Sequence, residues 1–483
     1  MIFMCLGKIC GAIYKLPLTS ILGASGIGMY QLVFPIFVTI VMVSSQGTSL
    51  AVTKLVADGK MNYKKVFFEG IKLTLILSVC LSLLIIVFSR QISNIQGNEN
   101  IYPLYYYVAI LIVFVSVLSV YRGLFRGFQN IKIYAISEFI EQLGKLVFGL
   151  IFAVLFVKKG VLNGVIGAFI GIIFASIISL FYLIILSKKY RENKSGLLLN
   201  KKLFYNYTIF GSFSSIITPI SQFIDSIIII NLLNKIGLSE ESSTSNFGLL
   251  VGACSTITNL PLSLILAITT VALPSLSASN GEQKFKKTQE FLLYTFLITS
   301  VSSIVLFLFS NEIVSALYGS LSYYHQEICT FLIKITSIGV FFAGMSEMCL
   351  CIFQSDGKFY IGLISLIIGN LIKTILLICF IPKYGIYGAA YAFTFGYSAT
   401  AVVSYLWMRL RGEIGGNKVL YKALIYLVIF GNIAFLLKRF LSLTMLNLYI
   451  YLLVVGIALI TLFAFMTFLI INPKMLKFVL KKK

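Results

Sequence analysis

The chain of 483 residues is dominated by apolar side chains. Hydrophobic residues make up 59% of it and charged residues 11%, against roughly 25% charged residues in soluble domains. Apolar runs of about 20 residues recur along the whole length, each long enough to cross a bilayer as a helix. The formal charge of +23 is spread thinly between these runs, so we expect no nucleic acid partner. The composition predicts an all-α integral membrane protein.

The apolar runs predict about fourteen transmembrane helices. In chain order, the first six lie at 2–22, 27–53, 66–89, 103–121, 134–157 and 161–186. The next six lie at 205–234, 246–277, 288–310, 326–354, 359–381 and 384–408, and a last pair lies at 419–437 and 447–471. The predicted domains are an N-lobe at 1–187, a cytoplasmic linker at 188–202, a C-lobe at 203–410, and a helix pair with a basic tail at 411–483.

Lysine and arginine lie mostly in alternate loops of this prediction. With the N-terminus in the cytoplasm, the inner loops carry most of the cations, including those at 54–72, 188–202 and 284–287. The outer loops carry few, among them those at 158–159 and 438–439. Such an asymmetry sets the orientation of a membrane protein. We therefore predict a multi-pass protein of the bacterial cytoplasmic membrane with both termini cytoplasmic.

A weak internal repeat relates the two lobes. FQNIK from Phe128, followed by KKGVLNGVIGAF from Lys158, is similar to FQSDGK from Phe353, followed by KYGIYGAAYAF from Lys383. The two copies are six predicted helices apart, so both face the same way. Parallel repeats of this kind occur in transporters with a substrate site between the halves. The repeat predicts two parallel six-helix lobes, with the last helix pair outside the duplication.

Common enzyme signatures are missing from the sequence. The single histidine, His325, falls in a predicted outer loop, so histidine-based metal sites and triads lack their parts. No GxxxxGK[ST] segment is present, so we expect no ATP-driven step on this chain. Secondary transport, a channel or a structural role remain, and we expect no cofactor.

Charges inside the predicted spans are mostly basic. The lysines are Lys8, Lys15, Lys145, Lys334 and Lys373, and the comparably deep acids are Asp225 and Glu347. A charge at the centre of a membrane helix costs about 2.5–3.5 kcal/mol unless it faces water or a partner. An interior with this excess of lysine suits an anionic substrate better than an organic cation.

Two of these lysines share one face of the first span. Lys8 and Lys15 are seven residues apart, which is about 10 Å along a helix axis. Lys8 is as well explained by reaching to the inner membrane surface, whereas for Lys15 we favour a place in a substrate cavity. Pro17 should bend or break the helix beside Lys15.

The fifth span carries a further polar stripe, in which Lys145 follows Glu138 and Glu141. These residues could form a structural ion pair or bind substrate. Lys373, at a similar place in the second lobe, could line a cavity or extend outward. Asp225 could carry a proton, help to bind Na⁺, or pair with a lysine. Coupling to Na⁺, to H⁺ or to the membrane potential therefore stays open.

Several segments resemble stage V sporulation protein B and related polysaccharide biosynthesis proteins. They are GKICGAIYKLPLTSILGASGIGMYQ from Gly7, SSQGTSLAVTKLVADGK from Ser44, YRGLFRGFQNIKIYAISEFIEQLGK from Tyr121, LPLSLILAITTVALPSLSAS from Leu260, and GNLIKTILLICFIPKYGIYGAAYAF from Gly369. The resemblance extends over essentially the whole chain. It implies a place in the multidrug/oligosaccharidyl-lipid/polysaccharide exporter superfamily, beside the MurJ-type lipid II flippases.

The resemblance also implies site residues. Lys15 stands where relatives carry an arginine in the first span, so the charge is kept and the two-pronged guanidinium is lost. Gln31 stands where MurJ-type proteins have an acid, and Thr256 where they have another arginine. These departures favour the sporulation-protein branch over the MurJ branch.

The leading hypothesis from the sequence is a flippase for a lipid-linked glycan of cell wall or peptidoglycan synthesis. Its substrate would be an anionic, undecaprenyl-pyrophosphate-linked sugar, and its other partners membrane lipids; we expect a monomer. The alternatives are a cation-coupled multidrug exporter and a non-transporting scaffold of cell-wall or spore-envelope assembly.

Overall fold

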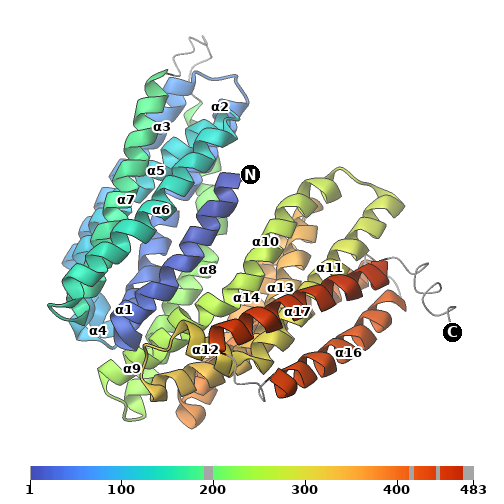
Figure 1. The fold of residues 1–483 in the computed structure, drawn as a ribbon. Coiled ribbons are helices and arrows are strands. Elements are labelled where there is room, and N and C mark those ends of the chain that lie inside the picture. The colour runs from blue at the N-terminus through green and yellow to red at the C-terminus, as the bar shows by residue number, and fades with distance from the viewer. Residues whose placement is uncertain (1, 190–199, 413–417, 442–446, 472–483) are drawn as a thin grey trace. The chain divides into compact units, whose positions relative to one another are not determined.

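The predicted membrane spans coincide with helices in a computed structural model of the chain (Figure 1). The structure describes residues 2–189, 200–412, 418–441 and 447–471, and these contain no strand. Ten helical segments in these ranges are long and apolar enough to cross a membrane. The first two predicted spans count there as one segment, Ile13–Ala57. The all-α membrane fold is thus confirmed.

The chain divides into two compact units, Met1–Ala253 and Cys254–Lys483. The helices of the first unit are α1 (Ile2–Val41), η1 (Met42–Gln46), α2 (Gly47–Ala57), α3 (Tyr63–Val87), α4 (Ser89–Ile95), η2 (Glu99–Ile101), α5 (Tyr102–Gly127), α6 (Ile131–Val157), α7 (Val161–Lys189), α8 (Lys201–Lys235) and α9 (Glu240–Phe247), followed by η3 (Gly248–Cys254). Those of the second unit are α10 (Ser255–Ser277), α11 (Gly281–Leu308), α12 (Ser310–Leu317), α13 (Tyr323–Ser355), α14 (Phe359–Tyr384), α15 (Ile386–Leu410), α16 (Lys418–Leu441) and α17 (Leu448–Ile471).

The compact units differ from the predicted lobes in where they place α8 and α9. Both helices pack within the first unit, because α8 contacts α2 at Gly47 and α9 contacts α1 at Gly28. At Gly47 a Cβ atom would lie 1.9 Å from the carbonyl oxygen of Thr208. The predicted domains follow topology and the repeat, and they stay a prediction. Most of the linker at 188–202 lies outside the described residues.

The break between the first two spans is made by a glycine. Gly23 interrupts α1 with φ 69° and ψ −175°, a conformation that residues with a Cβ rarely adopt. Pro17, where the sequence suggested a bend or break, lies inside the helix six residues earlier. A proline is tolerated there because neighbouring helices can compensate a lost hydrogen bond, whereas reversing the sign of φ requires glycine.

Helix starts in both units carry side-chain caps. The side chains of Asn62, Asn130, Asn200, Ser239 and Ser322 each accept a hydrogen bond from a backbone N–H in the first turn of the following helix. Such a cap satisfies one of the N–H groups that a helix leaves without a partner, typically worth about 1 kcal/mol. Polar residues at these boundaries therefore mark where these five helices begin.

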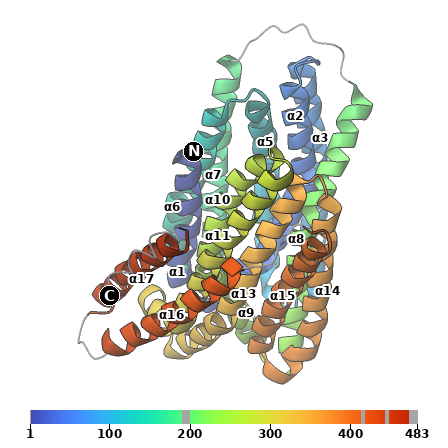
Figure 2. The same ribbon diagram turned by 90° about the vertical axis from the view of Figure 1, so that its right-hand side faces the viewer.

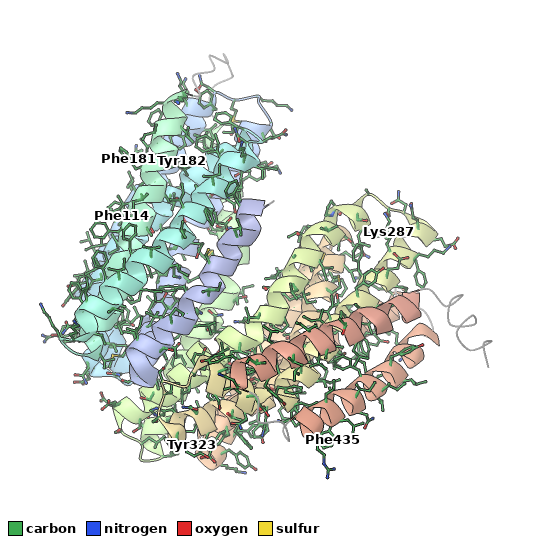
Figure 3. All side chains as sticks on the ribbon, viewed as in Figure 1. Phe114, Phe181, Tyr182, Lys287, Tyr323 and Phe435 are labelled. Carbon is green, nitrogen blue, oxygen red and sulfur yellow. The ribbon has the colours of Figure 1, made fainter. Side chains whose placement is uncertain are left out.

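The outward faces of the helices are apolar, as expected for contact with lipid. Phe181 on α7 is 63% exposed and Phe435 on α16 is 53% exposed (Figure 3). In the second unit, α13, α14 and α15 lie side by side (Figure 2), and α16 and α17 pack on α11 and α12 through Phe309, Phe430 and Tyr451. The last helix pair thus belongs to the second unit.

Candidate functional site

Two lysines from different helices meet in the first unit, where α1 and α6 run side by side (Figure 1). The Nζ atom of Lys15 lies 5.8 Å from the centre of the Phe34 ring, and the Nζ atom of Lys145 lies 5.9 Å from the same centre. Lys145 Nζ also lies 4.8 Å from the centre of the Tyr14 ring. The structure thus brings together two of the residues that the sequence singled out.

Neither ammonium group forms an ion pair with a carboxylate within the part of the chain that the structure describes. Both side chains are partly buried, and their charges are close enough to repel each other. The rings of Tyr14 and Phe34 offset part of the cost of burial, by about 0.5–2 kcal/mol for each cation–π contact. Two positive charges consequently remain available to an anion.

Small residues make room for this pair of lysines. A Cβ atom at Gly149 would lie 2.8 Å from Cε2 of Tyr14, so Gly149 allows the Tyr14 ring to pack against α6 directly below Lys145. Gly171 allows α7 to pack closely against α6, since a Cβ atom at Gly171 would lie 2.4 Å from the backbone of Gly149. On the other side, Tyr30 is fully buried and stacks on Phe34, with ring centres 5.7 Å apart. The rings under the ammonium groups are therefore held by close packing.

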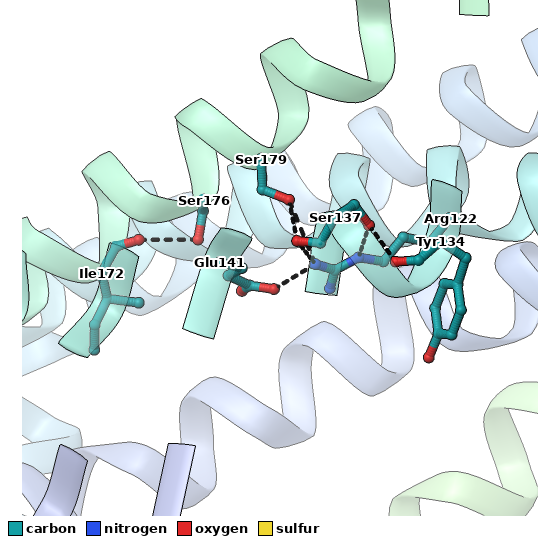
Figure 4. A network of polar contacts seen from close by, with 7 residues as sticks. All are labelled: Arg122, Tyr134, Ser137, Glu141, Ile172, Ser176 and Ser179. Atoms are coloured by element: carbon teal, nitrogen blue, oxygen red, sulfur yellow. Dashed lines mark hydrogen bonds and ion pairs between the residues drawn. The ribbon is translucent and has the colours of Figure 1, made fainter. Parts of the chain in front are cut away.

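Glu141 lies one helical turn before Lys145 but pairs with Arg122 of α5. The distance from Arg122 Nη2 to Glu141 Oε2 is 2.7 Å. The guanidinium also donates to Ser137 through its Nε, 3.1 Å from Oγ, and its Nη2, 3.0 Å from the backbone oxygen. Ser179 of α7 lies 3.5 Å from the same Nη2 and donates to the Ser137 carbonyl at 2.7 Å (Figure 4). The network ties α5, α6 and α7 together.

Glu138 lies nearly one turn before Glu141 and faces a second arginine. Its charge interacts with that of Arg126, whose Nη2 donates to Ser49 Oγ at 2.9 Å. The Arg126 guanidinium also lies 5.3 Å from the centre of the Tyr134 ring. Both predicted acids of α6 are thus close to arginines of α5.

The two arginines were not among the predicted site residues. Hydropathy ended the fourth span at residue 121, so Arg122 and Arg126 counted as loop cations. The helix instead continues to Gly127 and carries both along α6. A usable signal was present in the spacing, since two arginines four residues apart precede two glutamates three apart.

The remaining predicted residues lie elsewhere. Gln31 is 3% exposed and donates from Nε2 to the carbonyl oxygen of Val251 at 3.2 Å. Asp225 is 5% exposed on α8. Lys373 belongs to α14 of the second unit, with Nζ 5.5 Å from the centre of the Phe393 ring. Lys8 lies on α1, and its side chain is outside the described part of the structure.

The part of the sequence that forms this site matches a known protein family. The profile described as polysaccharide biosynthesis protein matches residues 1–280, which is more than half of the chain and includes both lysines. The chain belongs to this family. The membership agrees with the resemblance predicted from the motifs at Gly7, Ser44 and Tyr121.

Known relatives of this polysaccharide biosynthesis protein cover most of its length. Stage V sporulation protein B of Bacillus subtilis (strain 168) is 23% identical over 414 residues, 80% of this chain and 78% of the relative. Lipid II flippase MurJ of the same strain is 22% identical over 465 residues, 89% and 84% of the two chains. The solved inward closed conformation of lipid II flippase MurJ aligns with a TM-score of 0.77 at 17% identity, over 99% of this chain and 100% of that one. The family fold is therefore that of a multi-pass membrane protein.

Proposed function

We propose that this protein moves an anionic lipid-linked glycan across the bacterial cytoplasmic membrane by alternating access, as a secondary transporter rather than an enzyme. The observation that carries the proposal is the pair of half-buried ammonium groups of Lys15 and Lys145, which no described carboxylate neutralises. The names of the relatives, a sporulation protein and a lipid II flippase, agree with it. The substrate we favour is an undecaprenyl-pyrophosphate-linked sugar.

The chemistry of the pair fits a pyrophosphate. Each ammonium has three N–H donors, and a cation held over a ring face still directs donors away from the ring toward an incoming oxygen. Hydrogen bonds from ammonium to phosphate oxygen are charge-assisted and are about twice as strong as neutral ones. A lysine is a flexible point charge, so the two groups can follow a pyrophosphate as it moves through the membrane.

The other predicted residues take supporting roles in this proposal. Lys8 adds positive charge on the same helix as Lys15, Lys373 carries a further positive charge for the substrate on α14, and Gln31 supplies an amide. Glu138 and Glu141 hold arginines of α5. Asp225 is the coupling group, for Na⁺ or H⁺, unless the membrane potential alone drives transport.

The test is binding and flipping by lysine variants. Purified protein in detergent is titrated with undecaprenyl pyrophosphate by microscale thermophoresis, and flipping of a fluorescent lipid-linked pyrophosphate sugar is followed in proteoliposomes. Loss of one ammonium in Lys15→Gln or Lys145→Gln should weaken binding about 10-fold to 100-fold, because a hydrogen bond to a charged group contributes about 1.5–3 kcal/mol. The flipping rate should fall in parallel.

Lys158→Gln is the matched control, because Lys158 is exposed and ends the same helix as Lys145. It should bind and flip like the wild type. Unchanged binding in the Lys15→Gln/Lys145→Gln double variant would overturn the assignment of the site. Transport of organic cations instead would indicate a multidrug exporter, and biological function without measurable transport would indicate a scaffold.

A further inference from the structure

We propose that Arg122 is a positioning residue, which holds the Glu141 carboxylate away from Lys145 and so keeps Lys145 available to the anionic substrate. The inference rests on the proposed function of the Lys15–Lys145 pair. It assigns Arg122 a role in the affinity of that pair through Glu141, to which its guanidinium is bound.

Spacing along the helix favours an ion pair between Glu141 and Lys145. The two residues are four apart on α6, and a glutamate four residues before a lysine is the favourable order for an ion pair on a helix. In a membrane span the attraction is stronger than in water, because the dielectric constant is lower. Glu141 is already close enough for its charge to act on Lys145. Without a competitor, the two side chains should pair.

Arg122 binds Glu141 in place of Lys145. Its guanidinium contacts Glu141 at 2.7 Å and is fixed from two sides by Ser137 and Ser179. A planar guanidinium held in this way loses little further freedom on pairing, whereas the flexible lysine stem must be ordered for every contact. The side chains of Arg122 and Glu141 are only 15% and 12% exposed, so water screens the pair weakly. Lys145 consequently turns to the rings of Tyr14 and Phe34.

The consequence for the substrate is electrostatic. With Glu141 bound to Arg122, an anion meets the two charges of Lys15 and Lys145. If Glu141 were bound to Lys145, an anion would meet one net positive charge and would have to displace a carboxylate. The pairing of Glu141 thus decides how strongly the site attracts a pyrophosphate.

A mutant cycle tests the inference. In Arg122→Gln, Glu141 is released and should pair with Lys145, which weakens binding of undecaprenyl pyrophosphate about tenfold or more, as in Lys145→Gln. In Arg122→Gln/Glu141→Gln the released carboxylate is gone, so binding should return to within about threefold of the wild type. A purely structural role predicts the opposite, since the double variant loses the whole ion pair and should be no better than the single one.

Glu141→Gln alone keeps the test decisive if Arg122→Gln fails to fold. It breaks the same ion pair but leaves no acid near Lys145, so affinity should equal or exceed that of the wild type. Lys158→Gln is again the matched control, because it removes an exposed cation at the end of the same helix as Glu141. Its affinity should be unchanged.

The outcomes separate this inference from the proposed function. Normal binding by Arg122→Gln while Lys145→Gln loses binding would overturn the positioning role and leave the lysine site intact. Equal loss in Arg122→Gln and in its double variant with Glu141→Gln would likewise reject it. Normal binding by both lysine variants would instead reject the anion site itself.

Discussion

Single residues hold charge within this membrane protein in two different ways. Arg122 and Glu141 neutralise each other, and serine side chains satisfy the guanidinium. Lys15 and Lys145 keep their charge and rest on aromatic rings. The first arrangement gives each buried charge a partner inside the protein, which offsets part of the cost of its desolvation. The second is unfavourable for folding alone, because two like charges share one ring, and this is why we propose a ligand of opposite charge.

A third arrangement lies at the end of α13, outside the membrane-spanning segments. Burial raises the pKa of Asp356, but hydrogen bonds and charges of Lys284 and Lys358 outweigh it and hold that pKa below its ordinary value. A carboxylate with a lowered pKa stabilises the folded state above its unfolded pKa of about 4. That stabilisation is lost as the pH falls through the folded pKa.

Asp356→Asn should therefore lower the free energy of unfolding at pH 7 by about 1 kcal/mol. The melting temperature should fall accordingly. The difference from the wild type should narrow below a pH of about 4, where both proteins lack the charge. Thermal unfolding in detergent across this pH range measures it. Glu282→Gln is the control, since Glu282 pairs with Lys286 but its side chain is 81% exposed, and it should have no effect. A constant difference at all pH values would contradict the electrostatic explanation.

At the residue scale, the sequence singles out side chains where a charge lies within an apolar run, and their role in substrate binding stays a prediction. Lys15 and Lys145 were identifiable because each interrupts an apolar run of its own. The partner of Glu141 was not, because three candidates lay within reach: Lys145 on the same helix, and Arg122 and Arg126 on the preceding one. Choosing between them required the depth at which α5 ends and the place of Ser137 and Ser179 around the guanidinium.

At the scale of elements, close contact between α1 and α9 depends on glycine. A Cβ atom at Gly28 would lie 2.0 Å from the carbonyl oxygen of Thr244, and one at Gly248 would lie 2.5 Å from that of Ala24. These contacts are with backbone, which cannot rotate away as a side chain would. The two helices therefore pack so closely that only glycine fits at these positions.

Gly28→Ala should force α9 away from α1 and destabilise the protein by about 1–3 kcal/mol, the range for overpacked cores. The melting temperature and the yield of monodisperse protein in detergent measure the effect. Gly456→Ala on α17 is the control, because nothing lies within 4 Å of its Cβ position. That variant should be neutral or slightly stabilising, since alanine favours a helix over glycine. Equal stability of both variants would contradict the packing argument.

Hydropathy predicted which segments form helices, but it did not predict where each helix is interrupted or ends. Every predicted span coincides with a helix because an apolar run in lipid has few alternatives. The break expected between residues 22 and 27 lies at Gly23, but hydropathy alone did not predict that one glycine with a positive φ makes it without ending the helix. The extension of α5 to Gly127 escaped prediction for a related reason: arginine ends an apolar run without ending the helix.

For the whole molecule, hydropathy, loop charge and family motifs agree on one architecture. The family profile ends at residue 280, whereas the resemblance of the fold to lipid II flippase MurJ extends over 99% of the chain. The resemblance of the fold to lipid II flippase MurJ therefore includes the second unit, beyond the end of the family profile. Lys373 lies in that unit, and transport measurements test its proposed contribution to substrate binding.

Reporter fusions to the loops test the predicted orientation of the chain in the membrane. If both termini are cytoplasmic, alkaline phosphatase fused after Lys159, Lys235 or Lys383 should be active, because the enzyme folds only outside the cytoplasm. Fusions after Lys60 or Lys287 should be inactive, and green fluorescent protein at those two places should fluoresce, which controls for expression. The expectation follows from the concentration of lysine and arginine in alternate loops. A pattern that inverts from one loop onward would contradict the predicted topology and locate a span that crosses the membrane one time more or fewer than predicted.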